Sequence, residues 1–242
     1  MEHVTSASLS VCTPRRKSVV RTRHGEEGRN PFDALRPWSA ITHGIGAGLA
    51  LLGTVLLLLH IHNLPQLISF SIYGASMVAL YSASTLYHCL RTKVAGRRRL
   101  RKLDHCSICL LIAGSYTPIC MLALKDSCGP ALLVGVWIFA LAGILQSLLW
   151  ITAPRWLSAG VYLCMGWLAV FALKPLSAAL PLEGMIWLVA GGILYSAGGV
   201  LYALKWPGRN NPRFGCHEIF HVFILLGSVC HYINMYRVIV HL

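Results

Sequence analysis

The stretch CHEIFHVFILLGSVCHYINMYRVI, residues 216–239, is apolar over most of its length and carries a His-Glu-Ile-Phe-His sequence near its start. Its length is close to the ~20 residues that a helix needs to cross the hydrocarbon core of a membrane. His217 and His221 fit the H-E-x-x-H pattern, in which two histidines four positions apart share one helix face and bind zinc. The stretch therefore predicts a membrane-spanning helix with a metal site on it.

Six further apolar stretches of similar length precede this one, divided by proline, glycine, asparagine and charged residues. They lie at about 38–60, 67–90, 104–124, 131–152, 157–174 and 183–204. The composition agrees, because 56% of the residues are hydrophobic and only 12% are charged, whereas an ordinary soluble domain has roughly 25% charged residues. The sequence predicts an all-α membrane protein whose seven transmembrane helices occupy residues 38–242.

The basic residues are concentrated on one side of these predicted helices. The chain has 21 Lys and Arg residues and eight acidic residues, a formal net charge of +13. All but three of the basic residues, Lys125, Lys174 and Arg237, fall in the N-terminal tail or in loops on the same side as the tail. Because cytoplasmic loops carry an excess of Lys and Arg, we expect an inside N-terminus and an outside C-terminus in the plasma (inner) membrane. The charges do not follow one amphipathic face, which disfavours a nucleic-acid partner.

Residues 1–37 are polar, basic and rich in Ser, Arg and Gly, without an apolar core. This composition predicts a disordered cytoplasmic tail rather than a secretory signal. The tail and the basic loop at 91–102 are expected to contact anionic lipids of the inner leaflet, since each nearby Lys or Arg adds about 1 kcal/mol of attraction.

Four ionisable residues fall at one depth in the predicted bundle. His88 ends the second helix, Asp104 begins the third, and His217 and His221 lie in the first turns of the seventh. Three protein ligands plus water form a catalytic zinc site, and zinc lowers the pKa of its water to about 7. Ionisable groups at such a depth are costly and indicate function. We expect the three histidines to bind zinc, and Asp104 either to be a fourth ligand or to hold and deprotonate the water.

Two polar residues, Ser84 and Glu218, are neighbours of these predicted ligands in the sequence. Ser84 lies one helical turn before His88, where three roles fit: orienting a ligand, bonding substrate, or bonding a carbonyl of its own helix. In soluble zinc proteases the glutamate of H-E-x-x-H is the general base. Here Glu218 is rotated about 100° from His217 on the helix and no acidic residue follows it. A supporting or interfacial role is therefore favoured for Glu218.

Other histidines and the cysteines do not extend this site. His231 lies ten residues, about 15 Å, beyond His221 and is expected to be a packing or cavity residue. His105 is expected to point elsewhere on its helix, and no metal grouping is indicated around His43. The nine cysteines are mostly within apolar stretches, which predicts reduced thiols rather than a disulfide framework.

Four motifs together resemble the hemolysin III family, which is related to the adiponectin and progestin receptors and more distantly to alkaline ceramidases. They are THGIGAGLALLG (42–53), SASTLYHCL (82–90), KLDHCSICLLIAGSYTP (102–118) and HEIFHVFILLGSVCHY (217–232). The resemblance covers about 38–240. It implies seven helices with an inward N-terminus, zinc held by His88, His217 and His221, Asp104 reaching the zinc-bound water, and Ser84 as the matching serine.

Three functions are compatible with this resemblance. The first is zinc-dependent hydrolysis of a ceramide-like lipid amide, with an apolar cavity for the acyl chain. The second is pore-forming or cytolytic behaviour with a purely structural zinc, although the fourth to sixth helices carry too few polar residues for a wide single-chain pore. The third is a receptor or regulator of lipid homeostasis in the membrane. We take the hydrolase as the first hypothesis.

Overall fold

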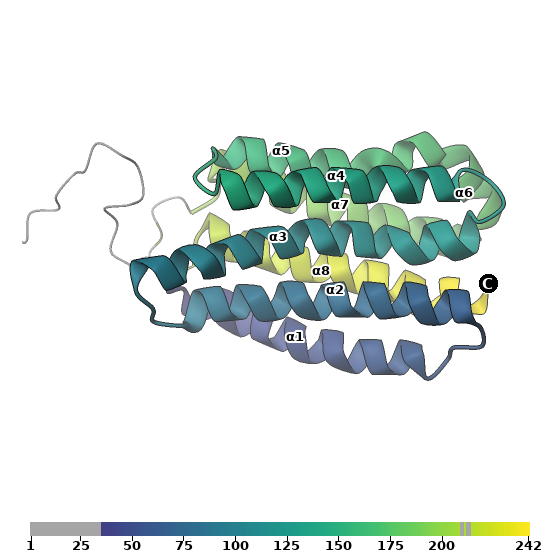
Figure 1. Ribbon diagram of the computed structural model, residues 1–242, viewed down its shortest axis with the longest axis horizontal. Coiled ribbons are helices and arrows are strands. Elements are labelled where there is room, and N and C mark those ends of the chain that lie inside the picture. The colour runs from purple at the N-terminus through teal and green to yellow at the C-terminus, as the bar shows by residue number, and fades with distance from the viewer. Residues whose placement is uncertain (1–34, 209–210, 212–213) are drawn as a thin grey trace, which may run out of the picture.

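The computed structural model describes residues 35–208, 211 and 214–242, which are entirely helical apart from their turns and short connections (Figure 1). The predicted disordered tail lies almost wholly outside the described residues. The longer helices are α1 (Pro37–Leu58), α2 (Leu64–Cys89), α3 (Val94–Pro118), α4 (Gly129–Leu149), α5 (Arg155–Gly166), α6 (Leu173–Ala179), α7 (Leu182–Leu204) and α8 (Cys216–Arg237). Short helical segments continue three of these, namely η1 (Ile119–Ala123), η2 (Trp167–Ala172) and η3 (Ile239–His241).

Seven helical segments of the described chain are long and apolar enough to cross a membrane. Five of them correspond closely to the predicted stretches, and the α5–η2–α6 segment, Arg155–Ala179, runs five residues further than the predicted end at 174. The all-α class and the seven membrane-spanning helices are thus confirmed. The eight described cysteines are free thiols, as expected for cysteines in apolar helices.

The start of the third helix was predicted wrongly. The prediction placed it at about 104, but α3 begins at Val94, so most of the basic run is helical. Arg and Lys are good helix formers, and Arg97 is buried there with its Nη2 donating to the Tyr87 carbonyl oxygen at 3.0 Å. Its guanidinium also lies 4.8 Å from the centre of the Tyr87 ring. Asp104 consequently lies well inside α3 rather than at its first turn.

Helix α8 packs against α1 on one side and α7 on the other (Figure 1). Glycines permit the closest approaches between α7 and α8. A Cβ atom on Gly191 would lie 2.7 Å from the His231 ring, and one on Gly227 would lie 2.5 Å from the Tyr195 ring. Dispersion and close packing, rather than the hydrophobic effect, hold helices together in lipid. These contacts therefore fix the position of α8, the helix that carries two of the predicted ligands.

Candidate metal centre

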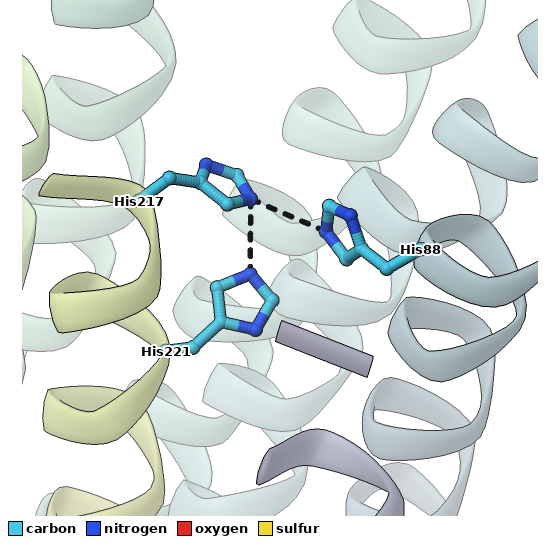
Figure 2. A group of neighbouring side chains, drawn as sticks. All are labelled: His88, His217 and His221. Atoms are coloured by element: carbon cyan, nitrogen blue, oxygen red, sulfur yellow. Dashed lines mark hydrogen bonds between the residues drawn. The ribbon is translucent and has the colours of Figure 1, made fainter. Parts of the chain in front are cut away.

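Three histidines from two helices point toward one another (Figure 2). His88 lies in the last turn of α2, and His217 and His221 lie in the first two turns of α8. The Nε2 atom of His217 is 3.2 Å from Nε2 of His88 and 3.1 Å from Nε2 of His221. His88 and His221 are buried, and His217 is half-buried. Residues 129 positions apart in the sequence thus form one compact cluster.

The donor atoms of this cluster fit a metal ion. Zinc binds histidine nitrogen at about 2.0–2.1 Å, which in tetrahedral geometry separates two such nitrogens by about 3.3 Å. The observed separations of 3.1 and 3.2 Å are close to that value. A neutral imidazole has only one N–H, so the Nε2 atom of His217 cannot donate to both of its neighbours. A cation bound between the three Nε2 atoms would accept the lone pair of each. The buried group could therefore hold a metal ion.

Asp104 and Ser84 border the same site. Both line a cavity of about 230 Å³ together with His217 and His221. Ser84 comes from α2 and Asp104 from α3, so the cavity wall at this point is formed by two neighbouring helices. In the described part of the chain, the group of converging ligand atoms consists of the three histidines and does not include Asp104. Asp104 therefore lies on the cavity wall beside the cluster and outside the converging group.

The rest of the cavity is mainly apolar and extends along α8 away from the histidines. Its lining includes leucine, isoleucine and methionine side chains of α3, α6, α7 and α8, and it reaches His231. His231 is therefore a cavity residue, one of the two roles expected for it. From His217 to His231 the helix rises about 21 Å. The cavity thus offers an elongated apolar space with the histidine cluster and a carboxylate at one end.

Glu218 is committed to structural contacts. Its Oε2 atom accepts a hydrogen bond from the Gly215 backbone N–H at 2.8 Å, and Oε1 lies 2.8 Å from Nη1 of Arg36. The Glu218 side chain is only 3% exposed. A carboxylate near the start of a helix satisfies N–H groups that have no partner within the helix. Glu218 thus supports the start of α8, in accordance with the supporting role favoured from the sequence.

Two histidines that had been set aside lie at the site. His105 was expected to point elsewhere, but it lines the cavity, with its Nδ1 atom 3.2 Å from the Tyr162 hydroxyl. His43 had no indicated grouping, but its ring lies 3.8 Å from the ring of His221 between centroids. Neither histidine belongs to the converging ligand group of the described residues, as the sequence led us to expect for His43. Their positions beside the site were not predicted, because helix periodicity gives the face of a residue but not the neighbour that this face meets. The spacing of Arg36, Ser39 and His43 was the available signal, since it places all three on one face.

Comparison with known proteins agrees with this geometry. The family model described as Haemolysin-III related matches residues 36–232, which include all five predicted site residues. The chain belongs to the hemolysin III family. It is 42% identical over 193 residues to the Hemolysin-3 homolog of Bacillus subtilis (strain 168), covering 78% of this chain and 87% of that protein.

Other hemolysin III relatives extend the comparison. The chain is 37% identical to Hemolysin-3 of Bacillus cereus over 193 residues, with 78% of this chain and 85% of the relative covered. It is also 29% identical over 194 residues to the Adiponectin receptor protein of Drosophila melanogaster, covering 71% of this chain and 44% of the receptor. The relation to adiponectin receptors that the motifs implied is thereby confirmed.

Proposed function

We propose that this hemolysin III family protein is a zinc-dependent hydrolase of a lipid amide, with a ceramide-like substrate. The observation that carries the proposal is the position of three converging histidine nitrogens at one end of an apolar cavity that also contains a carboxylate. The ligand set of three histidines is one that zinc takes in catalytic sites. When bound, zinc supplies a Lewis acid for the amide carbonyl and lowers the pKa of its water to about 7.

Residues next to the histidine cluster carry out the proton transfers of the proposed reaction. Asp104 holds the attacking water and accepts its proton, and Ser84, which lines the same cavity, orients the Asp104 carboxylate through its hydroxyl. The leaving amine then takes a proton from the same carboxyl group. General acid–base catalysis of this kind contributes about 10²- to 10⁴-fold to a rate. Glu218 takes no part, because both of its oxygens are occupied by Arg36 and the Gly215 N–H.

The apolar part of the cavity suits the acyl chain of the substrate. Its walls are mainly aliphatic side chains, and burying each CH₂ group of the chain contributes about 0.8 kcal/mol. With the acyl chain directed toward His231, the amide group lies next to the histidine cluster and Asp104, all of which share this cavity or its wall. Substrate enters from the membrane, where such lipids are dissolved, so lipids are the principal partners of the protein.

The proposed orientation places the histidine cluster in the cytoplasmic leaflet. The basic tail and the basic residues of 91–102 lie on the same side as the cluster, with the N-terminus inside and the C-terminus outside in the plasma membrane. Anionic lipids of the inner leaflet are their proposed partners.

The relatives named Hemolysin-3 and Hemolysin-3 homolog suggest cytolysis as a second function, and the motif resemblance to the family suggests control of membrane homeostasis as well. In that case a metal ion would join α2 to α8 without catalysis, since its ligands come from these two helices.

Purified protein in liposomes separates the two functions. We expect fatty acid to be released from a ceramide-like amide without leakage of an entrapped dye, because the cavity is apolar rather than a polar channel. Both signals are recorded from wild type and from a variant with all three cluster histidines changed to alanine. Dye leakage that persists in this variant, without fatty acid release from wild type, would favour the cytolytic function.

A further inference from the structure

Helix α1 contributes no atom to the converging ligand group of the described chain, yet one of its faces lies against the metal centre. This face carries Arg36, Ser39 and His43, which are three and four positions apart and hence aligned. Ser39 and His43 are buried, and Arg36 immediately precedes the helix. Arg36 and Ser39 contact Glu218, the neighbour of His217 on α8, and His43 contacts His221.

Arg36 joins the two helices that carry the cluster. Its backbone N–H donates to the His88 carbonyl oxygen at 3.2 Å, at the end of α2. Its guanidinium pairs with Glu218 at 2.8 Å, at the start of α8, directly beside His217. The residue that precedes α1 thus links the end of α2 to the start of α8.

The partner of Arg36 is itself held firmly. The Ser39 hydroxyl donates to Oε1 of Glu218 at 3.5 Å, and the Gly215 N–H donates to Oε2 at 2.8 Å. A buried carboxylate is tolerated only when it is paired and hydrogen-bonded. The first turn of α8 is therefore attached to α1 through a carboxylate whose two oxygens are both used.

His43 acts on the next turn of α8 through packing. Its ring lies against the ring of His221 with an interplanar angle of 36°, and against the edge of the Tyr81 ring at a centroid distance of 5.1 Å. Tyr81 in turn donates a hydrogen bond to Ser228 on α8 at 2.6 Å. The His43 ring is thus wedged between His221 and an anchored tyrosine, which fixes the plane of the His221 imidazole.

We propose that Arg36, Ser39 and His43 form a buttress on α1 whose role is to position His88, His217 and His221 for metal binding. The inference rests on the proposed metal site and assigns to α1 a function beyond crossing the membrane. It also gives Glu218 of the H-E-x-x-H sequence a role, because this residue attaches α8 to the buttress through Arg36 and Ser39. Partners that orient metal ligands from outside the coordination sphere are typically worth 10- to 100-fold in metal affinity.

The test is the zinc affinity of the full chain in detergent, measured by competition with a chelating dye. Arg36→Gln and His43→Ala are each expected to weaken zinc binding by about 10- to 100-fold and to change the absorption spectrum of the cobalt-substituted protein. The matched control is Arg237→Gln. It removes the 2.9 Å ion pair between Arg237, in the last turn of α8, and Glu183, in the first turn of α7. This pair is far from the cluster, so the zinc affinity and the cobalt spectrum should stay unchanged.

Two further variants separate positioning from a general loss of stability. His43→Phe keeps a ring against His221 and should retain near-wild-type affinity and cobalt spectrum, unlike His43→Ala. Exchanging the charges, Arg36→Glu with Glu218→Arg, should recover part of the affinity lost in Arg36→Gln. If Arg36→Gln does not fold, Arg36→Lys, which keeps the charge but not the guanidinium, replaces it with the same expected direction.

Unchanged zinc affinity and an unchanged cobalt spectrum in both Arg36→Gln and His43→Ala would overturn the buttress while leaving the proposed function intact. Wild-type protein that binds no zinc would instead overturn both. The wild-type measurement therefore distinguishes the two failures.

Discussion

Asp104→Asn is expected to lower the turnover of a ceramide-like amide by about 10²- to 10⁴-fold, while the zinc content of the protein stays the same. Asparagine has the shape of aspartate, and its side-chain oxygen can accept a hydrogen bond as the carboxylate does, but it cannot take a proton from water. Zinc is retained because Asp104 lies outside the converging ligand group of the described chain. The change therefore removes the proposed proton acceptor and leaves the three histidines in place.

Fatty acid release and zinc content are to be measured on the same preparation of the Asp104→Asn variant. Asp126→Asn is the control, because Asp126 is an exposed acid in the turn between η1 and α4, at the other end of α3. Loss of zinc together with loss of turnover would indicate that Asp104 is a metal ligand, which is the alternative that the sequence had left open. Turnover at the wild-type rate would exclude Asp104 as the proton acceptor.

His221→Ala is expected to abolish tight zinc binding and the stabilisation that zinc confers. Zinc that binds only the folded state raises the free energy of unfolding by about 4.1 kcal/mol at a free concentration one thousand times the dissociation constant. Removal of one of three ligands leaves His88 and His217, which are too few for a tight site. The substitution also removes the His221 ring that packs against His43, so one contact between α8 and the α1 buttress is lost as well.

Thermal unfolding in detergent, with zinc and with a chelator, measures the effect of His221→Ala. Wild type should melt at a higher temperature with zinc, and the variant should show no difference between the two conditions. His62→Ala is the control, because His62 is exposed between α1 and α2 and should keep the wild-type response. A variant that zinc stabilises as much as wild type would show that the metal binds elsewhere.

Hydropathy predicted the fold because burial in lipid demands long apolar helices whatever their packing. It did not predict the start of α3, because hydropathy marks the membrane-embedded part of a helix and not a polar extension beyond it. Arg97 shows why the extension is stable, since its guanidinium bonds the Tyr87 carbonyl oxygen and covers the Tyr87 ring.

Topology also predicted which histidines meet, because helix ends on one side of a membrane must lie at one depth. His88 and the two α8 histidines were found in this way, although His88 and His217 are 129 positions apart. The α1 buttress was not predicted. Its formation depends on which face of α1 meets α8, and this is decided by side-chain packing between helices rather than by periodicity within one helix.

The most direct test of the central claim is the release of fatty acid from a ceramide-like amide by purified protein in liposomes, before and after removal of metal. We predict turnover with one zinc per chain, loss of turnover when a chelator removes the zinc, and recovery when zinc is added back. Zinc-loaded protein that releases no fatty acid, or release that continues unchanged in the chelator-treated protein, would contradict the assignment of this site as a zinc-dependent lipid amide hydrolase.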